Sequence, residues 1–193
     1  MFKKEIGMEI PKFYNINSYH HLYNRGVKRD KIFLDDSDYK YFIRKMKEYK
    51  TKYLIEVICF CLLPNHFHLF VKQLTNEYTI GKFIGDLTNA YTRGTNKKYG
   101  RLGVIFESKT KSKLITDETY FIWLCKYILN NPVKAGLAIK PEGWEYSSAN
   151  EYFGMTSLNI TDKKEMLKRF NSIEEFASFI KIKEVEFDYS LFF

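Results

Sequence analysis

Residues 64–70 read Pro-Asn-His-Phe-His-Leu-Phe, and this stretch predicts a β-strand that carries two of the four histidines of the chain. Side chains at positions i and i+2 leave the same face of a strand, so His66 and His68 point together, while Phe67 and Leu69 point to the other face. Two imidazoles on one face supply half of the ligands that a metal site needs. Two histidines that are only hydrogen-bonded are the alternative interpretation.

Turn residues and apolar runs predict the elements on the N-terminal side of this strand. Residues 14–24 alternate loosely between apolar and polar side chains, which indicates a strand that ends in a turn at Asn24-Arg25-Gly26. Asp35 and the polar residues after it offer caps for a helix that runs to about Lys50. Residues 54–63 are almost continuously apolar, as in a central strand that is covered on both faces.

After the histidine strand, most of the apolar residues are spaced as on a helix. Apolar residues at positions 80, 83, 84, 87 and 91 predict a helix that ends near Gly94 or Gly100. Residues 104–116 predict a further strand, and Thr116-Asp117 caps a third helix. The apolar stripe of that helix consists of Phe121, Leu124, Cys125, Ile128 and Leu129.

The order of these elements is strand, helix, strand, strand, helix, strand, helix, which is typical of a ferredoxin-like α+β fold. We therefore expect an antiparallel sheet with helices mainly on one face, formed by residues 1–153. Two short helical patterns, at 161–170 and 172–181, predict a small C-terminal helical extension at 154–193.

Composition narrows the class of protein. Of the 193 residues, 45% are hydrophobic and 18% aromatic, which excludes a disordered chain. The 31 lysines and arginines against 23 acidic residues give a net charge of +8, which favours a polyanionic partner or an anionic surface. No apolar run reaches membrane-spanning length and the N-terminus lacks the pattern of a secretory signal, so we expect a cytoplasmic protein with no membrane partner.

The three cysteines are an odd number in apolar segments, as expected of reduced thiols in a core. Cys59 and Cys61 share one face of a predicted strand. A zinc-stabilised interaction module that uses these two thiols is therefore an alternative of a different functional class.

Among the 15 tyrosines, Tyr127 differs by its place on the third helix. At about 100° per residue it lies roughly 130° from the centre of the apolar stripe, so its hydroxyl should face away from the core contact of that helix. Asn131 lies four residues on, where its amide oxygen can approach the same ion as the histidines. Tyr91 continues an apolar stripe and is expected in the core. Alternatively, Asn131-Pro132 simply ends the helix.

Three separated motifs together resemble the HUH class of single-tyrosine transposases, in particular the REP-associated and related insertion-sequence members. They are the histidine motif at 64–68, residues 127–137, which run from Tyr127 through Asn-Asn-Pro to Leu137, and Trp-Glu-Tyr-Ser-Ser at 144–148. Asn24-Arg25-Gly26 resembles the end of the opening strand of that family. The resemblance covers about residues 14–153.

The resemblance implies a metal-dependent endonuclease and strand transferase that acts on single-stranded DNA beside a hairpin through a 5′-phosphotyrosine. By position, His66 and His68 correspond to ligands of a divalent metal, Mg²⁺ or Mn²⁺, and Tyr127 to the nucleophile, with Tyr91 as the substitute candidate. Asn131 stands where relatives place a polar residue that completes the metal shell. Such enzymes act as a monomer or a homodimer. A relative that binds DNA or RNA structure without cutting, and a replication initiator or relaxase, are alternatives.

Basic residues predict where DNA phosphates bind. Lys109, Lys111 and Lys113 share one face of the strand expected at 104–116. The same positive surface is extended by Arg25, Lys28, Arg29, Lys97, Lys98 and Arg101. Protection of an exposed sheet edge by lysines is the alternative role for the first three.

Overall fold

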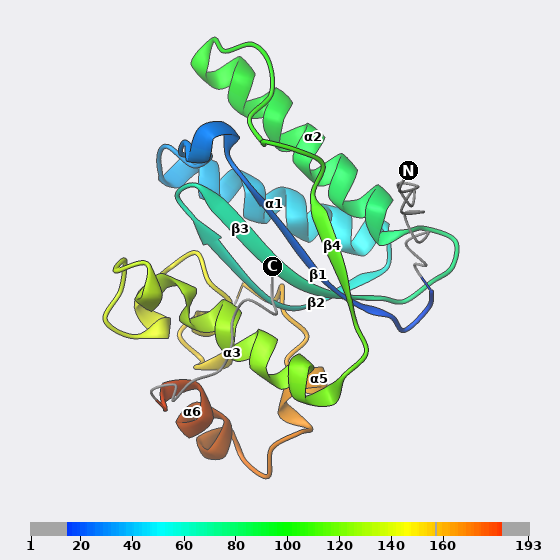
Figure 1. Ribbon diagram of the computed structural model, residues 1–193, viewed down its shortest axis with the longest axis vertical. Helices are drawn as coiled ribbons and strands as arrows, with labels where there is room; N and C mark the ends of the chain where they lie inside the picture. The colour runs from blue at the N-terminus through cyan, green and yellow to red at the C-terminus, as the bar shows by residue number, and fades with distance from the viewer. Residues whose placement is uncertain (1–14, 157, 183–193) are drawn as a thin grey trace, which may run out of the picture.

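The computed structural model describes residues 15–156 and 158–182, and its centre is a four-stranded antiparallel sheet (Figure 1). The strand order is β2-β3-β1-β4. The strands are β1 (Tyr19–Arg25), β2 (Ile55–Leu63), β3 (His66–Gln73) and β4 (Lys111–Ile115). Because β1 lies between β3 and β4, the residues of β1 pair directly with those of the histidine strand β3.

Two long helices cover one face of the sheet (Figure 1). α1 (Asp36–Lys52) begins at a capping box between Asp35 and Asp38, and α2 (Ile80–Tyr99) begins at Thr79. α2 ends at Gly100, whose φ of 61° is the left-handed conformation that favours glycine. The apolar core between these helices and the sheet includes Phe42, Leu69 and Tyr91.

α3 (Glu118–Lys134), capped by Asp117, packs on the opposite face, mainly against β2. Short helices follow it: α4 (Ala149–Tyr152), α5 (Lys164–Leu167) and α6 (Ile173–Lys181), with the 3₁₀ turns η1 (Val27–Arg29) and η2 (Pro141–Gly143) elsewhere in the chain. A second apolar core joins the sheet, α3 and α6 through Cys59, Phe70, Leu124 and Phe176. The α+β class, the antiparallel sheet and the predicted order of elements are confirmed, but the helices divide between both faces of the sheet.

The strand expected at 104–116 is shorter than predicted, because β4 begins only at Lys111. Before that point the side chain of Asn24 replaces the ladder bonds: its Nδ2 donates to the Ser108 carbonyl at 2.9 Å and to Thr110 Oγ1 at 3.2 Å. Lys109 therefore lies outside the strand.

The described part of the C-terminal extension, residues 154–156 and 158–182, packs on the same cores as the preceding elements, and residues 183–193 lie outside the described residues. Thr161 forms a parallel bridge with Val57 at the edge of β2. Met166 and Ile180 belong to the apolar cluster of α3. The division into 1–153 and 154–193 stays a prediction.

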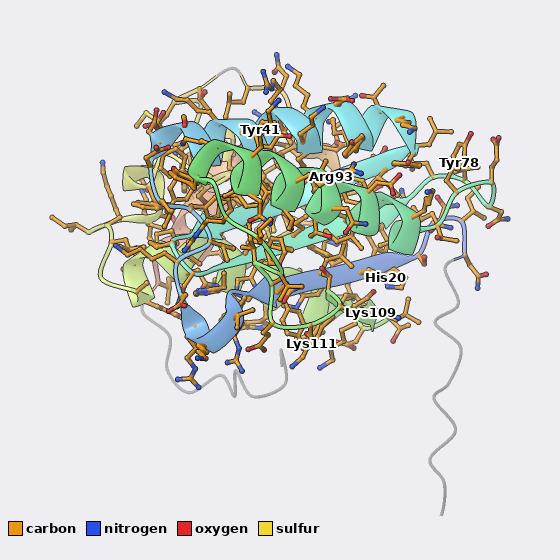
Figure 2. The ribbon with its side chains drawn as sticks, turned by 90° about the horizontal axis from the view of Figure 1, so that it is seen from above. His20, Tyr41, Tyr78, Arg93, Lys109 and Lys111 are labelled. Atoms are coloured by element: carbon orange, nitrogen blue, oxygen red, sulfur yellow. The ribbon has the colours of Figure 1, made fainter. Side chains whose placement is uncertain are left out.

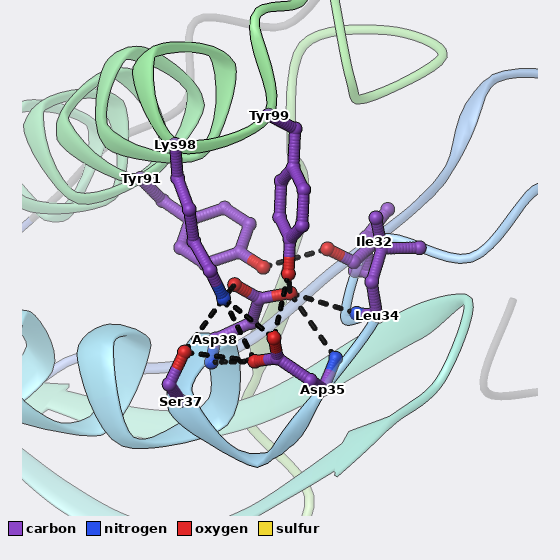
Figure 3. A network of polar contacts seen from close by, with 8 residues as sticks. All are labelled: Ile32, Leu34, Asp35, Ser37, Asp38, Tyr91, Lys98 and Tyr99. Carbon is purple, nitrogen blue, oxygen red and sulfur yellow. Dashed lines mark hydrogen bonds and ion pairs between the residues drawn. The ribbon is translucent and has the colours of Figure 1, made fainter.

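A polar network joins the start of α1 to the end of α2 (Figure 3). Lys98 Nζ lies 2.7 Å from a carboxylate oxygen of Asp35 and 2.8 Å from one of Asp38. The Tyr99 hydroxyl donates to both carboxylates. This network fixes the spacing of the two helices at one end of the sheet. No described helix combines the length and apolar character needed to span a membrane.

Candidate active site

His66 and His68 lie on the face of β3 that faces α3. The centroids of their rings are 5.2 Å apart, and the rings are perpendicular. Phe67 and Leu69 are buried on the opposite face, against α1 and α2. The predicted shared face is confirmed, and the two imidazoles are close enough to contact one ion.

The ring of Tyr127 packs edge-on against His68, with centroids 5.4 Å apart and an interplanar angle of 85°. Only 6% of Tyr127 is exposed, and it belongs to the apolar cluster of α3. The prediction that it faces away from the core is wrong. The surface of α3 that faces the sheet is wider than the apolar stripe and includes Tyr127, whose ring contacts His68 of β3.

Asn131 lies one turn beyond Tyr127 and reaches His66. Its Nδ2 donates to the Tyr127 carbonyl at 3.2 Å. A side-chain hydrogen bond with Asn131 acts to raise the pKa of His66, against burial, which lowers it. α3 continues through Pro132 to Lys134, and the alternative in which Asn131-Pro132 ends the helix is wrong.

The two histidines are held in their neutral form. Burial lowers the pKa of His68 well below its ordinary value, and the neighbouring His21 and His66 lower it further. Burial also lowers the pKa of His66; the hydrogen bond with Asn131 opposes this shift, and Arg25 reinforces it. Neutral imidazole is the form that binds a metal ion.

Each of the two histidines has its Nδ1 next to a neighbouring side chain. Nδ1 of His66 lies 2.6 Å from Oδ1 of Asn65, and Nδ1 of His68 lies 2.9 Å from Nε2 of His21. Sequence reasoning gave Asn65 no role at the metal site and placed His21 only in the opening strand. His21 reaches the site because β1 pairs with β3, and the apolar pattern of either strand does not specify that pairing.

Two further tyrosines, Tyr23 and Tyr120, lie at the site. Tyr91, the substitute candidate for the nucleophile, does not. Tyr23 is the cross-strand partner of His68. Tyr120 precedes Tyr127 by two turns; burial raises its pKa, and Tyr23 and Tyr127 add to that shift. Tyr91 lies in the core on the other face, where its hydroxyl donates to the Ile32 carbonyl at 2.6 Å. Tyr91 is therefore wrong as the substitute nucleophile.

The donors at this site fit a catalytic metal centre better than a structural one. Two imidazole nitrogens and an amide oxygen leave coordination positions for water or substrate. Among residues 15–156 and 158–182, no group of three or more His, Cys, Asp or Glu side chains is placed to hold a metal. Cys59 and Cys61 are buried, and burial raises the pKa of both thiols, so the zinc-stabilised module gains no support.

Residues 14–131 match the family model described as "Transposase IS200 like". The chain belongs to this transposase family. Over 133 residues it is 26% identical to a curated REP-associated tyrosine transposase of Haemophilus influenzae, a match that covers 61% of this chain and 76% of that protein. The fold is similar to that of a REP-associated tyrosine transposase solved with a REP hairpin, with a TM-score of 0.64, 17% identity, and coverage of 80% of this chain and 94% of that one.

A hollow of about 240 Å³ opens beside His68 in this transposase, lined also by Tyr23, Asn24 and Lys111. Asn24 and Ser108 continue from this hollow into a groove of about 630 Å³ between α2 and residues 104–110. Except for Ile84, the α2 side of the groove consists of small or polar residues: Gly81, Gly85, Thr88, Asn89 and Thr92. The hollow and the groove are therefore neighbours that share Asn24, Glu107 and Ser108 in their linings.

The lysines predicted on the strand at 104–116 lie close to the candidate site or to the groove beside α2. Lys111 and Lys113 lie on β4, over the rings of Tyr23 and Tyr120 at 5.6 and 5.0 Å from the centroids. Lys109 lines the groove beside α2. In Figure 2, Lys109 and Lys111 are labelled in the lower part of the view, and Tyr41 and Arg93 in the upper part.

The other predicted contacts are more distant or already paired. Arg25, at the end of β1, forms an ion pair of 2.7 Å with Glu107. Lys98 is bound to the carboxylates of the α1–α2 network. The remaining ones, in η1 and near the end of α2, are exposed: Lys28, Arg29, Lys97 and Arg101. The structure thus brings together His66, His68, Tyr127 and Asn131, with Lys111 and Lys113 nearby.

Proposed function

We propose that this transposase cuts and rejoins single-stranded DNA through a phosphotyrosine on Tyr127, with a divalent metal held by His66, His68 and Asn131. The observation that carries the proposal is the contact between the rings of Tyr127 and His68 within one chain. A phenol is a weak nucleophile near neutral pH and needs a positively charged centre beside it. Tyr127 is placed for such activation.

The side chains at the proposed metal site are suited to binding Mg²⁺ or Mn²⁺. The two histidines are neutral ligands on a rigid strand, and Asn131 offers a hard oxygen beside His66. A bound ion would polarise a non-bridging oxygen of the scissile phosphate. The Nζ of Lys134 lies 5.1 Å from the centroid of Tyr127 and adds a positive charge next to the attacking phenol.

In the covalent step the Tyr127 oxygen attacks phosphorus, and the bond from phosphorus to the 3′ oxygen breaks. Solvent takes up the phenolic proton and protonates the departing 3′ oxygen. The phosphate stays joined to the 5′ side as phosphotyrosine, so one phosphoester bond replaces another. Attack by a different 3′-hydroxyl reverses the step and rejoins DNA without an external energy source.

The substrate proposed is a single strand next to a hairpin, as the related transposase solved with a REP hairpin supports. The hollow at His68 is suited to the scissile phosphate, because Lys111 lines it. The groove along α2 is suited to neighbouring nucleotides, because its small side chains leave room beside polar groups.

The test is to incubate the protein with labelled single strands that carry a hairpin, in the presence of Mn²⁺, and to look for an adduct that survives denaturation. We expect an adduct with the wild type and with Tyr120→Phe, and none with Tyr127→Phe. Tyr120→Phe is the matched control, since it removes a phenolic hydroxyl from the same helix, close enough to Tyr127 for the two groups to interact.

Two results would overturn parts of the proposal. Adduct formation by Tyr127→Phe that Tyr23→Phe or Tyr120→Phe abolishes would move the nucleophile to that neighbour. Tight binding of hairpin DNA with no adduct under any metal would leave a protein that binds DNA structure without cutting it.

A further inference from the structure

His21 contacts His68 directly inside the sheet. Nε2 of His21 and Nδ1 of His68 are 2.9 Å apart, and the two rings are stacked, with centroids 5.2 Å apart. His21 is fully buried and only 1% of His68 is exposed. A hydrogen bond shielded from water in this way is stronger than the same bond at the surface.

The direction of this bond decides which nitrogen of His68 is a metal ligand. In a bond between two neutral imidazoles, one ring nitrogen carries the proton and the other accepts it. If His68 carries the proton on Nδ1 and donates to His21, the lone pair of His68 lies on Nε2. If His21 donates instead, Nε2 of His68 carries the proton and offers no lone pair.

We propose that His21 is a positioning residue of the metal site, which accepts the Nδ1 hydrogen of His68 and thereby keeps Nε2 of His68 as the ligand atom. This inference rests on the proposed function, because it takes His68 to be a metal ligand. Through His21, the opening strand β1 then has a role in the metal site that the sequence motifs do not reveal.

The second histidine of the site is held in the same way, which supports this direction. Nδ1 of His66 lies 2.6 Å from Oδ1 of Asn65, and an amide oxygen can only accept. His66 therefore carries its proton on Nδ1 and presents Nε2. With His21 as the acceptor for His68, both histidines present the same nitrogen to one ion.

The neighbouring His20 provides a matched control within the chain. It lies on the same strand and is 2% exposed, but its side chain faces the other side of the sheet. Its ring nitrogens lie 3.0 Å from Ser112 Oγ and 3.2 Å from Ser18 Oγ. A substitution there disturbs β1 to a similar degree without touching His68.

The first measurement needs no variant. Two-dimensional ¹⁵N NMR of the full chain without metal identifies the protonated nitrogen of His68 in its neutral form. We expect the proton on Nδ1. A proton on Nε2 in the folded wild type overturns the inference.

The second measurement is Mn²⁺ binding, followed by electron paramagnetic resonance, for the wild type and three variants. His21→Phe keeps a ring of similar shape but removes the acceptor, and we expect an affinity about 10- to 100-fold lower. His21→Gln restores an accepting oxygen near the same place and should recover most of the affinity. His20→Gln should bind Mn²⁺ as the wild type does.

His68→Ala separates failure of this inference from failure of the proposed function. If His68→Ala binds Mn²⁺ as well as the wild type, the metal site itself is wrong. If His68→Ala loses binding while a folded His21→Phe keeps it, the metal site stands and the positioning role is wrong. Equal losses in His21→Phe and His21→Gln, with both variants folded by circular dichroism, also overturn the positioning role, because an accepting group then makes no difference.

Discussion

Tyr127 meets His68 within a single chain, ring edge against ring face, at a centroid distance of 5.4 Å. We therefore expect the candidate nucleophile and the candidate metal ligands to act within one protomer. We expect that mixing Tyr127→Phe with His68→Ala produces no DNA adduct, because neither chain then holds a complete site. Adduct assays on the mixture, beside each variant alone, check this. Recovery of the adduct on mixing would show that two chains share the site.

Lys111 is expected to be a phosphate contact, because it lines the hollow at His68 and lies over the ring of Tyr23. For single-stranded DNA each lost phosphate contact reduces the slope of log affinity against log salt by about 0.7. Lys111→Ala should reduce the slope by about that amount. Lys40→Ala, on α1 beyond the opposite face of the sheet, should leave it unchanged. An unchanged slope for Lys111→Ala would favour the alternative role of guarding the sheet edge.

The order of elements could be predicted because caps and apolar spacing are local features. Asp35 and Asp117 each accept a backbone N–H at a helix start, as their positions before apolar runs indicated. The shared face of His66 and His68 follows from the two-residue period of a strand alone.

Tertiary contacts account for what sequence reasoning missed. His21 joins the site only because β1 is inserted between β3 and β4. Tyr127 is buried because its ring packs against His68 of β3, so the helical stripe did not mark the whole surface that α3 buries. Lys109 falls outside β4 because the side chain of Asn24 ends the ladder early. None of these three arrangements is specified by local periodicity.

The glycines of α2 should differ in their response to substitution. A Cβ at Gly85 would meet no atom within 4 Å, whereas one at Gly94 would lie 2.6 Å from the ring of Tyr41. We expect Gly85→Ala to raise the free energy of unfolding by about 0.5–1 kcal/mol, since glycine costs that much inside a helix. Gly94→Ala should lower it by about 1–3 kcal/mol through overpacking. Urea denaturation of both variants measures the difference.

Gly85 also tests the groove along α2. Gly85→Trp should weaken binding of single-stranded DNA because it fills the groove, while Gly85→Ala should bind as the wild type does. Fluorescence anisotropy with a labelled hairpin strand measures both. Wild-type affinity in a folded Gly85→Trp would exclude the groove from the DNA path.

Lys98 should matter more for stability than for DNA binding. Its ammonium is bound to Asp35 and Asp38, and the Asp38 side chain is only 3% exposed (Figure 3). Lys98→Ala leaves that buried carboxylate with fewer donors, so we expect a lower melting temperature and an unchanged salt slope. Lys97→Ala, one residue earlier and exposed, should leave the melting temperature unchanged. A reduced salt slope for Lys98→Ala would restore Lys98 as a phosphate contact.

Glu165 should make the docking of the C-terminal extension sensitive to acid. Burial acts to raise the pKa of Glu165, but hydrogen bonds from Lys168, Lys72 and Tyr19 outweigh it and lower the pKa from the ordinary 4.5 to about 2. A lowered carboxyl pKa contributes stability above the unfolded value, and that contribution is lost as pH falls from 4.5 towards 2.

Glu165→Gln tests this coupling. We expect the variant to melt below the wild type at pH 7, and the two melting temperatures to converge as pH falls from 4.5 to 2. Glu48→Gln, an exposed carboxylate on α1, serves as the control and should follow the wild type throughout. A constant difference between Glu165→Gln and the wild type across this range would mean that the charge of Glu165 adds nothing, and that its neighbours respond to its shape alone.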